Sequence, residues 1–255
     1  MSSSGSRDKI SYQELIELNR QFDEQLGNLN NKSRKEQGSL STRFFKIGKF
    51  VFRLFLLVSC LIAPFIVLVR TSVFMYSRYS WNGWAALSAG VIATISLLIG
   101  VAFYFVMRYG KGARIRINKF IFRGISMLVI CYTIYGLLYY SSMNTKTPKI
   151  RSYYRALHPI MRVALATTTL ADQDMLVTDI QRVPEDYDRM GLPERQRSLH
   201  FLQADGYVHA VDLRTKGRSV LENWGMQVAL EIVGLQTLRH VGTADHLHVY
   251  LPLND

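Results

Sequence analysis

Three long apolar stretches, separated by short polar segments, dominate the first 140 residues of the chain. They cover residues 50–69, 84–107 and 121–140, and each is long enough as a helix to cross a hydrocarbon core of ~30 Å. The middle stretch has no charged residue, whereas the others carry Arg53 and Arg123 near one end, where a long side chain can reach the headgroups. The pattern therefore predicts three transmembrane helices.

A different periodicity precedes the first apolar stretch. Over residues 10–30, apolar side chains recur every three or four positions, which predicts an amphipathic helix lying on the membrane or on a neighbouring subunit. The stripe consists of Leu15, Leu18, Phe22, Leu26 and Leu29. A coiled coil is the alternative, although it normally needs more heptads. Residues 1–9 are rich in Ser and Gly and are expected to be disordered.

Details of the apolar stretches predict how the helices pack. Ala86, Gly90 and Thr94 recur every four residues, and such a stripe of small side chains allows a second helix to approach closely. Pro64 is expected to kink the first helix. Aromatic residues typical of the membrane interface stand near the ends of the stretches, namely Trp81, Trp84, Tyr139 and Tyr140.

The pattern changes again after residue 140. Residues 141–152 are polar and are expected to form a linker, and residues 183–197 a polar loop. Helices are predicted over residues 153–170 and 219–234, and strands over residues 175–180, 207–213, 235–241 and 246–251. This order predicts an α+β domain with a small antiparallel sheet. The expected domains are an N-terminal segment (1–49), a three-span membrane domain (50–140), the linker (141–152) and the C-terminal domain (153–255).

Charge is unevenly distributed and predicts the orientation in the membrane. Residues 1–148 carry 19 Lys/Arg against 6 Asp/Glu, whereas residues 149–255 carry 12 against 13. The basic excess therefore brackets the apolar spans, which argues against nucleic-acid binding and for contact with a lipid bilayer. The segment 108–123 contains six basic residues and no acidic one, so it and the N-terminus are expected in the cytoplasm. Three spans then place the C-terminal domain on the far side, with the first span as an uncleaved anchor.

Cysteine usage restricts the chemistry of the C-terminal domain. The only two cysteines, Cys60 and Cys131, both lie in apolar stretches. A disulfide within the C-terminal domain and a thiolate zinc site are therefore excluded.

Alternation along two predicted strands brings candidate metal ligands together. Asp212 lies on one face of the strand 207–213, and His248 on one face of the strand 246–250. If these faces adjoin, Asp212 and His248 approach each other, and His200 would complete the set from a preceding loop. Two His and one Asp leave a fourth tetrahedral position for water, as hydrolytic zinc sites require. Asp245, just before the last strand, is then placed to accept a proton from that water.

The other four histidines have simpler interpretations. His158 and His240 have no partner pattern and are expected at the surface or at a helix end. His209 and His246 each neighbour a proposed site residue, and they are interpreted as hydrogen-bonded structural histidines.

Residues 175–251 resemble the zinc D-alanyl-D-alanine carboxypeptidases and L-alanyl-D-glutamate endopeptidases of the hedgehog-like fold. Their pattern reads Ser-x-His-x-x-Gly-x-Ala-x-Asp, followed by Glu/Asp-x-x-His. The matching segments are Ser198-Leu199-His200, His209-Ala210-Val211-Asp212-Leu213 and Asp245-His246-Leu247-His248. The stretch from Thr178 to Glu185 also resembles a Ser-x-x-x-Arg-x-Pro-Glu lead-in. The membrane part has no counterpart in this family.

The resemblance implies a role for each matched residue. His200, Asp212 and His248 would bind Zn²⁺, and Asp245 would be the general base. Arg182 would hold a substrate carboxylate or the tetrahedral oxyanion, since its forked donor suits a carboxylate.

The chain departs from the family pattern between the first two ligands. Eleven residues separate His200 from Asp212, where the family has six, and Val208 replaces the family's Gly. An ungapped alignment would place Asp205 at the first ligand position. Either a loop longer by five residues still lets His200 reach the metal, or the site has lost its first ligand.

Two functions remain open. The first is a membrane-anchored zinc peptidase that hydrolyses peptidoglycan stem peptides, in a bacterial inner (cytoplasmic) membrane with the C-terminal domain periplasmic or extracellular. The second is a catalytically degenerate domain that binds wall peptide or serves as an accessory subunit, contacting membrane proteins through the transmembrane helices or the N-terminal helix. A transporter or channel is disfavoured, because the spans are few and lack buried ionisable residues.

Overall fold

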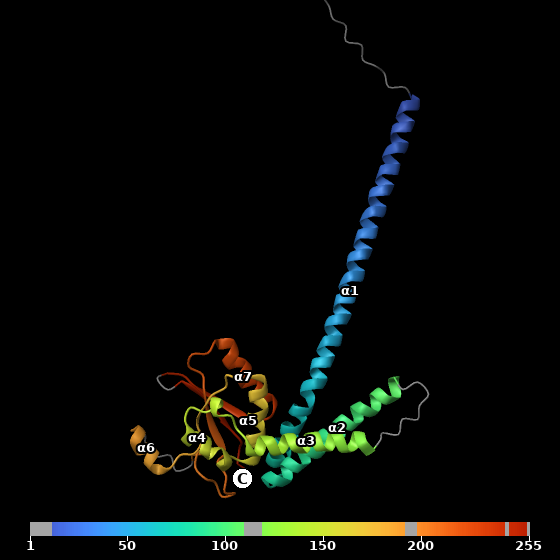
Figure 1. The fold of residues 1–255 in the computed structure, drawn as a ribbon. Coiled ribbons are helices and arrows are strands. Elements are labelled where there is room, and N and C mark those ends of the chain that lie inside the picture. The colour runs from blue at the N-terminus through green and yellow to red at the C-terminus, as the bar shows by residue number, and fades with distance from the viewer. Residues whose placement is uncertain (1–11, 110–118, 192–197, 243–244, 254–255) are drawn as a thin grey trace, which may run out of the picture. The chain divides into compact units, whose positions relative to one another are not determined.

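The computed structural model describes residues 12–109, 119–191, 198–242 and 245–253 (Figure 1). By its contacts the chain divides into two compact units, one ending at Cys60 and the other beginning at Leu61. The predictions for residues 1–9 and for the centre of the basic loop, residues 110–118, lie outside the described residues.

The amphipathic segment near the N-terminus is helical, as predicted. It belongs to helix α1, which begins at Tyr12 and ends at Tyr79, so this segment and the first apolar span form one helix. The apolar side chains of Leu18, Phe22 and Leu26 are exposed, while those of Leu15 and Leu29 lie outside the described part. The exposed stripe in residues 12–27 stays available to a membrane surface or a partner.

Three helices are long and apolar enough to cross a membrane, which confirms the prediction of three spans. The candidate spans are Phe45–Tyr79 in α1, Gly83–Arg108 in α2 (Gly83–Tyr109) and Phe120–Leu138 in α3 (Lys119–Leu138). The first is longer than the predicted 50–69, and α1 continues through Pro64. Its missing N–H removes one hydrogen bond of the helix without ending it.

The stripe of small residues on α2 packs as predicted. Ala86 and Thr94 are buried, and Gly90 lies against α1. A Cβ added at Gly90 would lie 2.2 Å from the Ser72 Oγ and 2.3 Å from the Leu68 carbonyl oxygen. Only a residue without a side chain allows the two backbones to approach this closely.

The C-terminal region contains the predicted α+β arrangement. A four-stranded antiparallel sheet has the order β1-β2-β4-β3. Its strands are β1 (Val177–Asp179), β2 (Ala210–Arg214), β3 (Gln236–His240) and β4 (His246–Tyr250). Val211, Leu213, Leu247 and Val249 share one face, which joins a buried apolar cluster with α5 (Pro159–Ala171) and α7 (Val220–Ile232). The alternate residues of β2 and β4 therefore face away from the helices.

The helix predicted over residues 153–170 is interrupted. The structure has a 3-10 helix, η2 (Tyr153–Ala156), followed by α5 from Pro159. Proline disfavours the helical conformation of the residue before it, and here His158 has ψ 137° and forms the N-cap. A single helix was thus the wrong expectation, because Pro159 starts a new one.

Two segments predicted to be irregular are partly ordered. Residues 141–152, expected to form a linker, contain η1 (Ser142–Asn144) and α4 (Pro148–Ser152). The buried Asn144 amide donates to the carbonyl oxygens of Gln173 and Met175, at 2.7 and 2.9 Å, which attaches this segment to the sheet domain. In the predicted loop 183–197, α6 (Pro184–Met190) forms because Pro184 fits the first helical turn, while residues 192–197 lie outside the described part.

Candidate metal centre

Two of the predicted ligands face each other across neighbouring strands. Asp212 of β2 is the register partner of His248 of β4. Both side chains stand on the sheet face turned away from the helices, since Leu213 and Leu247 point to the core. The histidine Nδ1 lies 2.8 Å from the Asp212 Oδ1. Alternation along the strands therefore placed this pair correctly.

His200 reaches the same point from the preceding turn, despite the longer loop. Backbone hydrogen bonds hold the turn, from Arg182 N to His200 O (3.1 Å) and from His209 N to Leu199 O (3.0 Å). The Ser198 Oγ accepts from the Tyr187 hydroxyl at 2.8 Å and from the His200 N–H at 3.3 Å. These bonds hold His200 beside Asp212 and His248, although eleven residues separate it from Asp212 along the chain.

The spacing of the three ligand atoms fits a tetrahedral metal ion. The His200 Nε2 lies 3.3 Å from the His248 Nδ1 and 3.3 Å from the Asp212 Oδ1. Two ligands of a tetrahedral zinc, each about 2.0–2.1 Å from the metal, are separated by roughly 3.3 Å. Two of the three separations match this value, whereas the third, at 2.8 Å, is that of a direct hydrogen bond between His248 and Asp212.

The contacts of His200 require a proton or a metal ion between these groups. The His200 Nδ1 lies 2.6 Å from the Ile180 carbonyl oxygen, which can only accept, so this nitrogen carries the proton. The His200 Nε2 faces the Asp212 carboxylate 3.3 Å away. Either a second proton on the ring, donated to Asp212, or a metal ion occupies the space between these two atoms. A carbonyl that fixes the tautomer in this way is typical of metal-binding histidines.

Arg182 binds the carboxylate of Asp212, and Asp179 in turn binds Arg182. Arg182 donates from Nη2 to the Asp212 Oδ2 and from Nε to the Asp179 Oδ2, both at 2.5 Å. Burial would raise the pKa of the Asp212 carboxyl, but the bonds with both histidines and the Arg182 charge hold that pKa well below its usual range. Asp212 is therefore ionised, with Oδ2 fixed by the arginine and Oδ1 directed at the histidines.

This arrangement changes the interpretation of Arg182. The resemblance implied that its fork holds a substrate carboxylate or the oxyanion. In the structure two donors of the fork are already bound to Asp179 and Asp212. The contacts therefore make Arg182 a positioning residue for the proposed ligand Asp212.

Asp245 has partners that the sequence pattern does not indicate. Its carboxylate accepts from the Thr215 hydroxyl at 2.6 Å and from the Arg239 Nε and Nη2 at 3.0 and 3.1 Å. The bonds with Arg239 and Thr215 hold the pKa of Asp245 below its usual range. A general base works best with a pKa near the operating pH, so these partners weaken Asp245 in that role.

Two further histidines extend the same face of the sheet. The His246 Nε2 lies 3.8 Å from the Asp212 Oδ1, and the His246 ring stacks on His240 with a centroid separation of 4.7 Å. His240 is exposed, as expected. His246, interpreted from the sequence as structural, also borders the proposed ligands, because it shares the face of His248.

His158, Asp205 and His209 form a second group of His and Asp residues. The His209 Nε2 bonds to the Asp205 Oδ2 at 2.9 Å, which confirms the expected hydrogen-bonded His209. His158 forms the N-cap of α5, which confirms the expected helix-end position, but it is fully buried and not at the surface. Its Nδ1 accepts from the Ile160 N–H at 3.3 Å, and its Nε2 lies 3.8 Å from the Asp205 Oδ2, so the ligand atoms of His158, Asp205 and His209 also lie close together. Tyr76 of α1 packs on the His158 ring, with centroids 4.8 Å apart.

Replacing His158 by Asn is expected to remove part of the acid sensitivity of the fold. Burial, and then the neighbouring His209, lower the pKa of His158 to about 3, against about 6.5 in an unfolded chain. Below pH 6.5 the unfolded state binds the extra proton, so His158 lowers stability by at most about 1.4 kcal/mol per pH unit down to pH 3. Asn keeps a capping side chain and has no such titration.

Melting temperatures of the detergent-solubilised proteins between pH 7 and pH 4 check this prediction. The variant should lose less stability than the wild type over this interval, with exposed His240→Asn as the control. Parallel curves for the wild type and His158→Asn would show that His158 does not titrate in this way.

Several supporting residues were not found from the sequence. Asp179 binds Arg182, and Tyr187 binds Ser198. Ile180 contributes only its carbonyl oxygen, which binds His200. The sequence gives a weak indication for Asp179, because it precedes Arg182 by three residues, but it does not indicate which backbone carbonyl oxygen will bind His200.

No protein-family description, curated protein or solved structure matches this chain.

Proposed function

We propose that the chain is a membrane-anchored, zinc-dependent peptidase. The observation that carries this proposal is the convergence of His200, Asp212 and His248, whose ligand atoms all lie within 4.8 Å of one another. The bond of the His200 Nδ1 to the Ile180 carbonyl oxygen leaves Nε2 as the ligand atom of this ring, and the ionised Asp212 provides a carboxylate ligand. Three protein ligands are typical of catalytic sites, which keep one position for water or substrate.

The surrounding residues determine how such a site would work. Ile180 fixes the ring of His200, and Arg182 fixes the carboxylate of Asp212, so these ligands are positioned before any metal binds. A bound zinc ion supplies Lewis acidity, which polarises a carbonyl group and acidifies water. Asp245, the proposed general base, is bound to Arg239 and Thr215, so these bonds would have to break before it could accept a proton. His246, whose side chain is 25% exposed, lies beside the proposed ligand Asp212.

The proposed substrate is the stem peptide of peptidoglycan. Support comes from the resemblance to wall peptidases and from the charge bias that predicts the C-terminal domain outside the cytoplasm. The proposed location is a bacterial inner membrane, with the N-terminus cytoplasmic and the domain periplasmic or extracellular. The three apolar helices support the membrane part of this proposal.

The test uses the purified full-length chain in mild detergent. Metal analysis should find about one zinc per chain, and mass spectrometry should detect cleavage of stem peptides that contain L-Ala-D-Glu and D-Ala-D-Ala bonds. A chelator should stop cleavage and added zinc should restore it. Protease digestion of intact cells checks orientation, because the C-terminal domain should be accessible from outside. A chain that takes up no zinc under careful loading would refute the proposal.

The contacts of Asp245 favour a second candidate, a degenerate domain that binds wall peptide without hydrolysing it. An aspartate held by Arg239 and Thr215 stabilises the fold of β3 and β4 whether or not the site is catalytic. Asp245→Asn separates the two functions. In a hydrolase it should lower kcat by about 100-fold or more. A wild-type chain that binds zinc and stem peptide but releases no product would establish the second candidate.

A further inference from the structure

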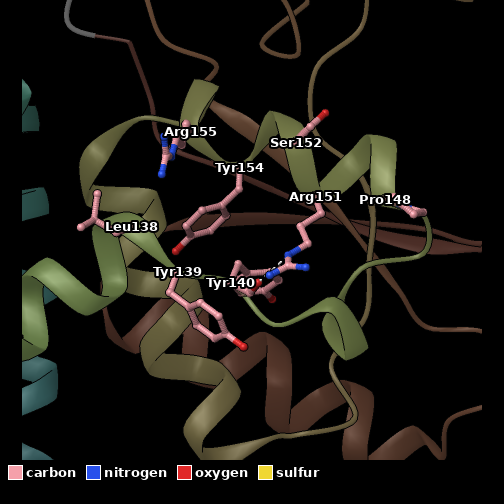
Figure 2. Close-up of a pocket in the computed structure, with 8 residues that line it drawn as sticks. All are labelled: Leu138, Tyr139, Tyr140, Pro148, Arg151, Ser152, Tyr154 and Arg155. Atoms are coloured by element: carbon pink, nitrogen blue, oxygen red, sulfur yellow. Dashed lines mark hydrogen bonds between the residues drawn. The ribbon is translucent and has the colours of Figure 1, made fainter.

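A cavity of about 450 Å³ lies where the third candidate span ends. Figure 2 shows the residues that line it: Leu138, Tyr139, Tyr140, Pro148, Arg151, Ser152, Tyr154 and Arg155. Leu138 is the last residue of α3, and the other lining residues follow it within the segment that also forms α4 and η2. A cavity at the end of a membrane span lies at the depth of the lipid headgroups.

The cavity has positive charge that no lining residue neutralises. Arg151 and Arg155 line it, and none of the lining residues is acidic. The Arg151 Nε donates to the Tyr140 carbonyl oxygen at 3.0 Å, and its guanidinium lies 5.9 Å from the centroid of the Tyr139 ring, but no described acidic residue pairs with its charge. Arg155 is exposed, and its side chain has no hydrogen bond or ion pair with any residue that the structure describes. Both guanidinium groups can therefore bind an anion.

The stacked rings of Tyr140 and Tyr154 lie between the two arginines. The rings of Tyr140 and Tyr154 stack with centroids 4.8 Å apart, and both residues are buried. The Tyr154 hydroxyl lies 2.5 Å from the Gly136 carbonyl oxygen and 2.7 Å from that of Arg162, which ties the stacked rings to α3 and α5. In Figure 2, Leu138 and Arg155 lie on one side of the tyrosine rings, and Arg151 and Pro148 on the other.

We propose that this cavity binds the headgroup of an anionic phospholipid, with its phosphate held by Arg155 and with Arg151 adding positive charge to the same cavity. Guanidinium groups form charge-assisted hydrogen bonds with phosphate oxygens, and basic pockets beside membrane helices suit such headgroups. A soluble phosphate offers the same charge. The lipid is favoured because Leu138 and the partly exposed Tyr139 ring provide apolar contact at the end of a span. The cavity is distinct from the metal centre and does not depend on it.

The test is a titration of the full chain in neutral detergent with short-chain phosphatidylglycerol and, separately, with short-chain phosphatidylcholine. Arg155→Gln is the main variant, because the described structure gives this side chain no structural partner. Lys146→Gln is the matched control, since it removes one positive charge from an exposed residue of the same segment that does not line the cavity. Melting curves verify that both variants are folded.

The wild type should bind phosphatidylglycerol saturably and about tenfold more tightly than phosphatidylcholine. Arg155→Gln should lose about tenfold in phosphatidylglycerol affinity, whereas Lys146→Gln should lose about twofold or less. Equal losses in both variants, or equal affinity for the two lipids, would overturn the proposal. Inorganic phosphate and glycerophosphate form the last arm: if either binds as tightly as phosphatidylglycerol, the ligand is a soluble phosphate and the lipid assignment is wrong.

Discussion

Zinc binding is expected to be lost when His248 is replaced by Ala. The ring supplies Nδ1 at 2.8 Å from the Asp212 Oδ1 and 3.3 Å from the His200 Nε2, so its removal leaves two protein ligands. Removing only a hydrogen-bonding partner of a ligand already weakens metal binding by about 10–100-fold, so losing a ligand should weaken it by more than about 100-fold. Cleavage of stem peptide should disappear with the metal. Metal content after dialysis, together with a competition titration of zinc, measures the effect.

His240→Ala provides a matched control for this variant. His240 is a histidine of the neighbouring strand, and its ring centroid lies 6.3 Å from that of His248, but it is not one of the three proposed ligands. This control should retain zinc with an affinity within a few-fold of the wild type. Equal zinc content in the wild type and both variants would place the metal elsewhere and remove the basis of the proposed hydrolysis.

Gly90→Ala is expected to destabilise the contact between α1 and α2. The new methyl carbon would lie 2.2 Å from the Ser72 Oγ and 2.3 Å from the Leu68 carbonyl oxygen, well inside van der Waals contact. The serine side chain can rotate, but the Leu68 carbonyl belongs to the backbone, so the helices must separate. Overpacking typically costs about 1–3 kcal/mol, and a backbone clash belongs at the upper end of that range. The melting temperature in detergent should fall by several degrees.

Gly100→Ala, in the same helix, has the opposite expectation. Nothing lies within 4 Å of a Cβ added at Gly100. Alanine is a better helix former than glycine by about 0.5–1 kcal/mol, so this control should melt at the same temperature as the wild type or slightly higher. If Gly90→Ala behaves like Gly100→Ala, the close approach of α1 and α2 described above does not occur.

The spans and most elements of the C-terminal region could be predicted because their signals are local. Runs of about twenty apolar residues identify the three helices, and the stripe with Gly90 at its centre correctly predicted where α1 packs. The predicted strands fall within a few residues of β1 to β4. The errors arose where a single residue overrides a periodic pattern: Pro159 begins a new helix, and the buried Asn144 attaches the supposed linker to the domain.

For the metal centre, spacing identified the ligands but not their surroundings. Alternation placed Asp212 opposite His248, as the register of β2 and β4 confirms. Whether His200 reaches them depends on how the longer loop folds, which no spacing rule specifies. The bond from His200 to the Ile180 carbonyl oxygen, and the ion pair of Asp245 with Arg239, join residues whose proximity is created by the sheet.

The sequence by itself determined that the chain has three membrane-spanning candidates and a small α+β domain, and which three side chains are suited to bind a metal. These properties depend on composition and on periods of two and 3.6 residues, which act locally along the chain. Only the tertiary structure decided that His200 meets Asp212, that Arg182 is bound to that aspartate, and that Arg151 and Arg155 line one cavity at the end of α3. Such contacts depend on distances between separate elements, which are set when the apolar core packs.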